Sequence, residues 1–524
     1  MITLSKSEYM MFLKHPAWLW LKRHDKKKLP EPDANLQAMF DAGNLFEKYA
    51  EELFSDIVRV GFENYNEYLS MPDRTKKALA DGAKVLTQGR FEADIDRYSI
   101  TCIVDVIELV EENTFDLYEI KSSTKVKPDH IEDLAFQVIV LEGAGYKVRN
   151  ISVIYCNNSY VRHGEIDAKQ MTCKEDVTIQ VKSKLESTRR NIVAAINTIG
   201  LESMPDPTPR RVKLGGYKEW IDILLSIKPT DDKYSIYSLA QVTPEQIGNL
   251  EDMHISSIVD IPDTFELKPV QKRQIEATKL GEPIVDAGKI AKFIDKLEYP
   301  IYFLDYETLS SIVPPFDGLK PYQQLPFQYS LHILKSLDAD LEHREFLHTL
   351  DTNPVPELLA QLQSDIGDKG SVLVWYEGFE KTCNNLMAEL QPDYAVFLAQ
   401  VNDRVLDLML PFKNGHYVDK DFMGSASIKN VLPVLAPELS YKDMDISEGA
   451  TAQRLWMEAV YTDKNSEAEK AKLMESLRQY CELDTYAMVR IFEFLIALTR
   501  GEVLQGNAIG LPASNKSFEQ QSLF

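Results

Sequence analysis

The sequence has no long apolar run, and its cysteines are few. No stretch approaches the roughly 20 consecutive apolar residues of a membrane-spanning helix, and no basic, apolar leader opens the chain. The five cysteines show no C-x-x-C spacing, so the sequence indicates neither a zinc site nor a disulfide framework. We therefore expect a cytoplasmic protein with no membrane partner.

Positive charge is scarce as well. The chain has 58 Lys and Arg against 81 Asp and Glu, which gives a net charge of −23 at pH 7. A uniformly acidic surface repels phosphate, so this balance argues against a protein that coats nucleic acid non-specifically. It does not exclude a nuclease, because metal-binding acids add to the negative count and a local basic groove is enough.

The first chemical signature lies in residues 101–121, TCIVDVIELVEENTFDLYEIK. Two apolar, β-branched runs flank a polar stretch at 111–114, which is the pattern of a β-hairpin. Glu119 and Lys121 then leave the same strand face, where Asp105 reaches them from the partner strand. Two carboxylates that close repel unless a divalent cation neutralises them, and the lysine is placed to contact a scissile phosphate. The alternative is a surface hairpin with solvated charges.

These residues resemble the PD-(D/E)xK nuclease superfamily, whose motif matches Asp105 and the Glu-Ile-Lys of Glu119 to Lys121. Gln137, in DLAFQVIVLEGAGY, is similar to the glutamine of the RecB-like branch, and the opening LSKSEYMMFLKHPAWLWL resembles that branch's first helix. The resemblance implies catalytic roles for Lys121 and Gln137. It also implies one or two Mg²⁺ or Mn²⁺ ions held by Asp105, Glu119 and Glu47, although Glu47 fits a helix-cap or surface role equally well.

The RecB-like resemblance also bears on cofactors and on the order of elements. Some RecB-like nucleases carry a four-cysteine iron–sulfur cluster, but His15 stands at the first cysteine position here and no later cysteine trio follows. We therefore expect no iron–sulfur cluster. Apolar periodicity predicts a helix over 131–141, a strand over 150–158 and a long helix from 173 to about 199.

A second signature begins at residue 299 with YPIYFLDYETLSS, an apolar strand that carries Asp305 and Glu307 on one face. Tyr480 and Asp484 lie at i and i+4, and therefore on one face of a helix. With one further acid, these groups suit a two-metal phosphodiesterase. One ion then generates hydroxide and the other stabilises the leaving 3′ oxygen, while Tyr480 orients or deprotonates the water.

The second signature resembles the DnaQ-like (DEDD) 3′–5′ exonucleases whose last motif is Tyr-x-x-x-Asp, over about residues 300–500. The family's middle motif matches Tyr-Glu-Gly-Phe-Glu at 376–380, with Glu380 where Asp is usual, in a helix expected to begin near Glu380. Asp407 competes with Glu380 for the second metal position. The resemblance implies two Mg²⁺ or Mn²⁺ ions in this site, bound by Asp305, Glu307, Glu380 and Asp484.

The chain ends in Gln-Gln-Ser-Leu-Phe, which resembles the bacterial sliding-clamp-binding pentapeptide except at Gln521, where Leu is usual. We expect Gln520, Leu523 and Phe524 to contact the clamp, since a terminal apolar pair can dock in a partner's pocket. Chance occurrence of so short a motif is the alternative. Such recruitment would offset weak intrinsic affinity for nucleic acid.

Together these features predict an α/β protein in which a PD-(D/E)xK restriction-endonuclease-like core and an RNase H-like (DnaQ-type) mixed sheet with flanking helices are joined by a helical linker. We divide the chain into a RecB-like domain (1–200), a helical connector that is either helix-hairpin-helix-like or a structural spacer (201–297), a DnaQ-like domain (298–500) and a flexible tail (501–524). The layout resembles a bacterial fusion of the two nuclease domains.

The predicted function is a metal-dependent DNA nuclease with two active sites, in repair, recombination or antiviral defence. An RNA-processing exonuclease and a clamp- or DNA-binding adaptor with inert sites are the alternatives, and a helicase partner stays open. The sequence is compatible with Mg²⁺ and with Mn²⁺, with a DNA or an RNA substrate, and with either polarity at the RecB-like site.

Overall fold

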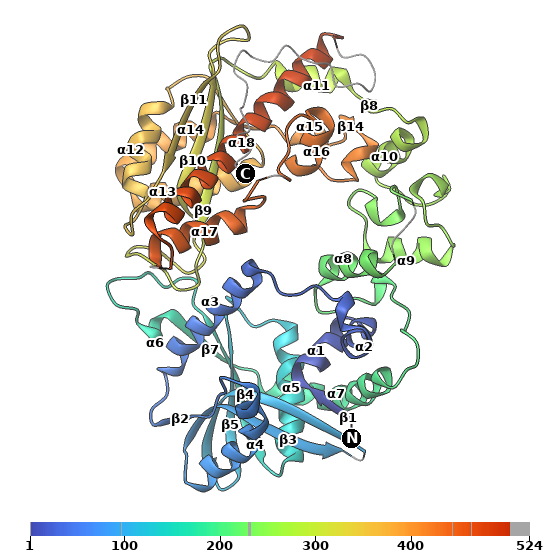
Figure 1. Ribbon diagram of the computed structural model, residues 1–524, viewed down its shortest axis with the longest axis vertical. Coiled ribbons are helices and arrows are strands. Elements are labelled where there is room, and N and C mark those ends of the chain that lie inside the picture. The colour runs from blue at the N-terminus through green and yellow to red at the C-terminus, as the bar shows by residue number, and fades with distance from the viewer. Residues whose placement is uncertain (1, 96, 229–231, 443, 463, 503–524) are drawn as a thin grey trace. The chain divides into compact units, whose positions relative to one another are not determined.

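The computed structural model describes residues 2–95, 97–228, 232–442, 444–462 and 464–502. The chain forms two compact units, each of mixed α/β structure (Figure 1). Unit 1 comprises Met1–Asp231, Thr243–Asp252 and Ser311–Tyr322, and unit 2 comprises Asp232–Val242, Met253–Ser310 and Gln323–Phe524. The α/β class is thus confirmed. Residues of the predicted connector, 201–297, are divided between the units, and Gln520, Leu523 and Phe524 lie outside the described residues.

Unit 1 is built on a seven-stranded sheet of order β2-β3-β4-β5-β6-β7, with β1 paired to β4. Its strands are β1 (Ile2–Ser5), β2 (Ile57–Arg59), β3 (Val85–Ile95), β4 (Tyr98–Glu111), β5 (Thr114–Lys121), β6 (Lys147–Cys156) and β7 (Thr172–Asp176). The predicted hairpin is confirmed: β4 and β5 pair antiparallel, and the turn between them places Asn113 in the left-handed region at φ 56°. This turn fixes the register that positions Asp105.

Helix α5 (Pro128–Gly143) leads from β5 to the parallel strand β6, which confirms the predicted helix and strand there. The expected long helix was wrong at its start, because residues 172–176 form β7 and α7 begins at Thr178 (Thr178–Ile199). The cause is tertiary: β7 pairs antiparallel with β6, and that pairing sets the local structure.

Both faces of the unit 1 sheet are covered. Leu117 packs in a cluster with buried residues of α1 (Lys6–Lys14), α2 (Pro16–His24), α5 and α7, whereas its neighbour Tyr118 packs against α3 (Ala34–Glu51). His15 caps α2, where its Nδ1 accepts from the Ala17 N–H at 3.1 Å. Further helices of this unit are α4 (Tyr65–Ala80), α6 (Ala168–Met171), α8 (Tyr217–Ile227) and α9 (Pro244–Asp252).

Unit 2 contains a five-stranded mixed sheet of order β11-β10-β9-β12-β13. The strands are β9 (Ile301–Leu309), β10 (Leu325–Leu334), β11 (Glu342–Leu347), β12 (Ser371–Val374) and β13 (Val405–Asp407). The central strand β9 runs antiparallel to β10 and parallel to β12. Helix α18 (Glu467–Thr499) packs against β9 and β10, where its buried face meets the polar residues of β9.

The other elements of unit 2 are α10 (Pro269–Leu280), α11 (Ala287–Ile294), α12 (Val355–Asp365), α13 (Glu377–Leu390), α14 (Ala395–Asp403), α15 (Leu410–Lys413), α16 (Ile428–Leu435), α17 (Gly449–Tyr461) and the paired strands β8 (Ile284–Val285) and β14 (Tyr417–Val418). Among the described residues of both units, none of the helices combines the length and the apolar character that crossing a membrane requires.

Gly370, which precedes β12, offers a test of the unit 2 packing. Its φ is +88°, and a Cβ there would overlap the carbonyl oxygen of Pro300. We expect Gly370→Ala to lower the free energy of unfolding by about 3 kcal/mol or more, because backbone strain and overpacking add. Gly281→Ala is the control, since Gly281 has φ +74° but no atom within 4 Å, and should cost only about 1 kcal/mol. Equal losses in urea unfolding would contradict this packing.

Candidate functional site

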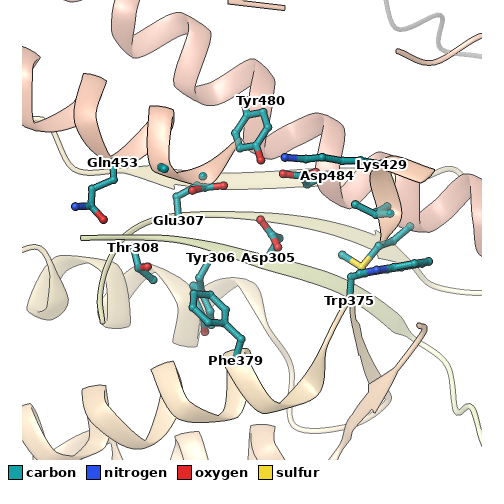
Figure 2. Close-up of a pocket in the computed structure, with 14 residues that line it drawn as sticks. Asp305, Tyr306, Glu307, Thr308, Trp375, Phe379, Lys429, Gln453, Tyr480 and Asp484 are labelled. Carbon is teal, nitrogen blue, oxygen red and sulfur yellow. The ribbon is translucent and has the colours of Figure 1, made fainter. Parts of the chain in front are cut away.

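Three acids meet in unit 2. Asp305 and Glu307 leave one face of β9, and Asp484 approaches them from α18. One carboxylate oxygen of each residue lies within 4.8 Å of the others. Figure 2 shows the three groups pointing into one space beneath Tyr480, within a cavity of about 420 Å³. The structure thus brings together two pairs of residues, Asp305 with Glu307 and Tyr480 with Asp484, that are far apart in the sequence.

Strand alternation explains why the two β9 acids share this face. Tyr306, between them, points to the opposite side and donates its hydroxyl to Asn384 Oδ1 at 2.9 Å. Asp305 and Glu307 lie opposite Ser330 and Gln328 of β10, and α18 packs on the same face. Because β9 lies between β10 and β12, its acids are enclosed on both sides.

Burial sets the electrostatics of this cluster. It raises the pKa of Asp305 well above the ordinary value, and the charge of Asp484 raises it further. Burial and the charge of Asp305 do the same to the pKa of Glu307. Burial raises the pKa of Asp484 to about 6. A medium of low dielectric disfavours each carboxylate, and three together disfavour one another, so the cluster favours a bound cation.

Glu380 is the fourth acid. It lies in the first turn of α13, which begins at Glu377 and not near Glu380 as expected. Glu380 is buried, its Oε2 has no hydrogen-bond partner, and burial together with Asp305 and Glu307 raises its pKa. Asp407 instead accepts the backbone N–H groups of Tyr376 at 3.1 Å and Met409 at 2.9 Å. Of these two competing acids, therefore, Glu380 interacts electrostatically with the cluster, whereas Asp407 accepts hydrogen bonds from the backbone.

Tyr480 completes the predicted set, and two neighbours were missed. Burial and Asp484 raise the pKa of Tyr480, so its hydroxyl keeps its proton. Tyr441 donates its hydroxyl to Asp484 Oδ1 at 2.6 Å. The ammonium of Lys429, on α16, lowers the pKa of Asp305 and Glu307 and lies 5.8 Å from the Tyr480 ring. Nothing in the sequence around Lys429 and Tyr441 singles out these two residues.

Unit 1 also assembles its predicted acids. The register that pairs Val106 with Tyr118 sets Asp105 beside Glu119, and Asp105 Oδ2 accepts the Ile120 N–H at 2.8 Å. Burial, and then the charge of Glu119, raise the pKa of Asp105 to about 8. The two carboxylates therefore repel each other in an enclosed place.

Three donors contact the carboxylate of Glu119. Lys121 Nζ lies 2.6 Å and Lys6 Nζ 3.1 Å from its Oε1, and Gln137 Nε2 donates to its Oε2 at 2.5 Å. Asp133, which is also buried, accepts from Gln137 at 2.9 Å and from Lys121 at 2.8 Å. Lys6 and Asp133 were missed, although the i, i+4 spacing of Asp133 and Gln137 on α5 is a visible signal.

Glu47 makes none of these contacts with Glu119 or Asp133 among the described residues. It belongs to α3, and Gln88 Nε2 donates to its Oε1 at 2.6 Å. Burial and the charge of Glu51 raise the pKa of Glu47. The charge of Glu47 in turn raises the pKa of Asp105. In the described part of the chain, Glu47, Asp105 and Glu119 do not form a group whose ligand atoms all lie within 4.8 Å of one another. The unit 1 acids are thus less tightly clustered than those of unit 2.

In the metal-free chain we expect the carboxyl groups of the Asp305 cluster to stabilise the fold progressively less as the pH rises through about 6. A carboxyl whose folded-state pKa is raised stabilises the fold below its unfolded pKa, and that stability is lost as the pH passes through the folded pKa. The folded pKa is about 6 for Asp484 and well above the ordinary value for Asp305. Asp305→Asn should therefore gain stability relative to wild type as the pH rises above about 6.

Urea unfolding in the presence of a chelator measures this difference. Asp340→Asn is the control, because Asp340 is exposed and lies outside the cluster. Parallel stability–pH curves for wild type and Asp305→Asn would contradict the electrostatic description of the cluster.

Lys6→Met tests the ion pairs of unit 1. The variant leaves Glu119 and Asp133 buried with one ammonium in place of two, which should cost about 3 kcal/mol. Lys14→Met, on the same helix, removes an exposed pair with Glu219 at 3.7 Å and a cation–π contact with Trp18 at 5.4 Å, and should cost less than about 1 kcal/mol. Equal effects on the unfolding midpoint would mean that Lys6 is not needed to balance these acids.

Comparison with known proteins adds a domain but no activity. A family model described as a domain of unknown function (DUF2779) matches residues 302–427, a range that holds Asp305, Glu307 and Glu380 and ends before Asp484. The chain is 26% identical over 232 residues to "Uncharacterized protein MG366 homolog" of Mycoplasma pneumoniae, covering 40% of this chain and 34% of the relative. It is 24% identical over 241 residues to "Uncharacterized protein MG366" of Mycoplasma genitalium, covering 42% and 36%. The chain thus spans about a third of the length of the curated relatives it matches.

Proposed function

We propose that this protein is a metal-dependent nuclease with two active sites. Unit 2 is a DnaQ-like 3′–5′ exonuclease and unit 1 is a RecB-like PD-(D/E)xK nuclease. The observation that carries the proposal is the group of four enclosed acids in unit 2, Asp305, Glu307, Glu380 and Asp484, whose pKa values are all raised. So many enclosed carboxylates are tolerated where cations neutralise them.

The donor atoms fit hard divalent cations. All four side chains offer oxygen, which suits Mg²⁺ and Mn²⁺, and Glu380 Oε2 is buried without a partner. Bound ions would supply an activated water and stabilise the leaving 3′ oxygen. The mixed sheet with α18 on one face supports the DnaQ-like assignment, since β9 and α18 carry the first and third motifs.

The chain's own residues have distinct tasks in unit 2. Tyr480 keeps its proton and therefore orients the attacking water through its hydroxyl. Tyr441 holds Asp484 by its 2.6 Å hydrogen bond, and Lys429 brings a positive charge to the edge of the cavity. A phosphodiester that enters the cavity meets one ammonium group there, which offsets part of the negative charge of the acids.

In unit 1, Asp105, Glu119 and Glu47 would hold one or two ions. Lys121 would contact the scissile phosphate or orient the water, and Gln137 fixes Glu119 from α5. Lys6 adds a second ammonium beside the same carboxylate, so the site carries two cationic groups for one phosphate.

DNA is the proposed substrate, in repair, recombination or antiviral defence, with the sliding clamp and a helicase as candidate partners. An RNA-processing exonuclease shares the same chemistry, and contacts to the 2′-hydroxyl would separate the two. An adaptor with inert sites is less well supported, because both sets of acids and their lysines or tyrosines are present.

The deciding experiment is degradation of end-labelled single- and double-stranded DNA and RNA with Mg²⁺ or Mn²⁺. Asp305→Ala should reduce 3′ trimming by at least about 100-fold, because a metal ligand is lost. Lys121→Ala should leave that trimming intact and remove a separate cleavage. Asp340→Ala and Lys14→Ala are matched controls for charge, since both residues are exposed.

Two outcomes would reject the proposal. If the wild-type chain degrades none of these substrates with either metal, the adaptor function replaces it. If Asp305→Ala and Lys121→Ala both retain full activity, the activity comes from neither site. Cleavage of RNA alone would keep the two-site chemistry and change the substrate class.

A further inference from the structure

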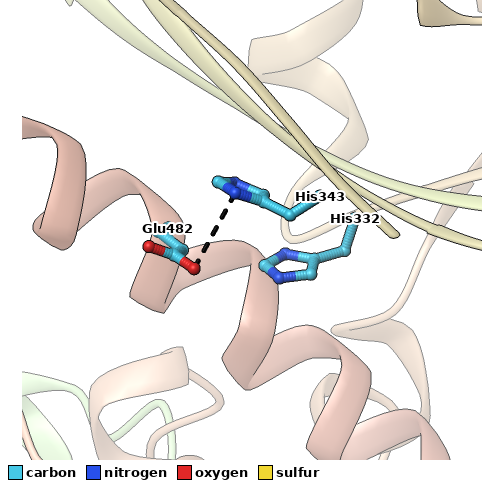
Figure 3. A group of neighbouring side chains, drawn as sticks. All are labelled: His332, His343 and Glu482. Atoms are coloured by element: carbon cyan, nitrogen blue, oxygen red, sulfur yellow. Dashed lines mark ion pairs between the residues drawn. The ribbon is translucent and has the colours of Figure 1, made fainter. Parts of the chain in front are cut away.

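A second cluster of ligand-type side chains lies in unit 2. His332 of β10 and His343 of β11 are directly paired across the two strands, with ring centroids 4.5 Å apart. Glu482 of α18 faces them, and its Oε1 lies 3.8 Å from His343 Nδ1. One ligand atom from each residue lies within 4.8 Å of the others (Figure 3). Three elements therefore converge on one point.

Two hydroxyl groups hold the imidazoles from behind. His332 Nδ1 lies 2.8 Å from Thr485 Oγ1, and His343 Nε2 lies 2.9 Å from Ser330 Oγ. The two hydroxyls are 2.7 Å apart, and Thr485 donates to the Glu482 carbonyl at 3.1 Å. A hydroxyl donates only one hydrogen bond. Every group in this hydrogen-bond network is therefore satisfied when His332 donates to Thr485, His343 donates to Ser330 and Ser330 donates to Thr485.

That proton assignment leaves a lone pair on the outer nitrogen of each ring, Nε2 of His332 and Nδ1 of His343. Burial lowers the pKa of His332 to about 3 and that of His343 to about 4, so both rings are neutral at pH 7. The Glu482 carboxylate and the two outer ring nitrogens are then all acceptors, and the carboxylate lies 3.8 Å from His343 Nδ1. Histidines that bind metals have this arrangement, with the rear nitrogen donating to a fixed acceptor.

We propose that His332, His343 and Glu482 bind a transition-metal ion of the zinc type. Two nitrogens and one carboxylate oxygen form a donor set that Zn²⁺ uses in proteins, and they differ from the all-oxygen cluster at Asp305. The side chains of His343 and Glu482 are 25% and 33% exposed, so the ion is reachable and a water can complete its shell. The inference stands independently of the nuclease proposal.

The site has a positioning role in the fold. Glu482 is two residues from Tyr480 and from Asp484 on the same helix. An ion bound by Glu482 together with residues of β10 and β11 would therefore fix the rotation of α18 about its axis and its position along the sheet. The predicted consequence is a Zn²⁺-dependent rise in the unfolding midpoint that comes from unit 2.

Binding of Co²⁺ to the full, tag-free chain tests the inference, because Co²⁺ at such a site absorbs visible light and Zn²⁺ displaces it. We expect a single visible-absorbing site that excess Mg²⁺ does not remove and that Asp305→Asn/Asp484→Asn retains. His343→Gln and Glu482→Gln should each weaken binding by at least about 100-fold, and Ser330→Ala by about 10-fold. His416→Gln, in the same unit but outside the cluster, should bind like wild type.

Unfolding in a chelator shows whether each variant folds, and the midpoints of His343→Gln and wild type should then be close. Only the rise that Zn²⁺ adds should be absent from the variant. If the Co²⁺ absorption disappears in Asp305→Asn/Asp484→Asn and persists in His343→Gln, the ion belongs to the carboxylate cluster and the inference fails. It also fails if wild type binds Zn²⁺ no more tightly than His343→Gln.

Discussion

The mutual repulsion of four enclosed carboxylates is the constraint on which unit 2 depends. Strand alternation places Asp305 and Glu307 on one face of β9, but the packing of the surrounding core has to hold Glu380 and Asp484 beside them. Phe303 of β9 meets Phe492 of α18 edge-on at 5.6 Å, and Trp456 of α17 stacks on Phe327 at 4.5 Å. The first contact fixes β9 against α18, which carry three of the acids, and the second holds α17 on the neighbouring strand β10. Enclosing carboxylates that repel one another destabilises the fold, and such destabilising arrangements are typical of functional sites.

Features set by local periodicity could be predicted from the sequence. The alternation of β9 identifies Asp305 and Glu307 as partners, and the i, i+4 spacing identifies Tyr480 and Asp484 as one helix face. The hairpin of unit 1 is equally local, because two apolar runs and a polar turn define its register. In each case a few consecutive residues contain the whole geometric argument.

Features that depend on pairing between distant segments could not be predicted. Strand β7 exists because it pairs with β6, and its own residues favour neither strand nor helix clearly. Lys6 reaches Glu119 across 113 positions, and Tyr441 reaches Asp484 across 43. His332 and His343 become neighbours only through the β10–β11 register. One sequence on its own carries no signal for contacts between such distant positions.

The central claim is that the four acids of unit 2 form a metal site, and diffraction from crystals soaked in Mn²⁺ tests it most directly. Anomalous scattering identifies the ion without reference to any activity. We predict two Mn²⁺ peaks among Asp305, Glu307, Glu380 and Asp484, about 3.5 to 4 Å apart, as in two-metal phosphodiesterases. Mn²⁺ peaks elsewhere on the chain, with none among these four side chains, would contradict the account.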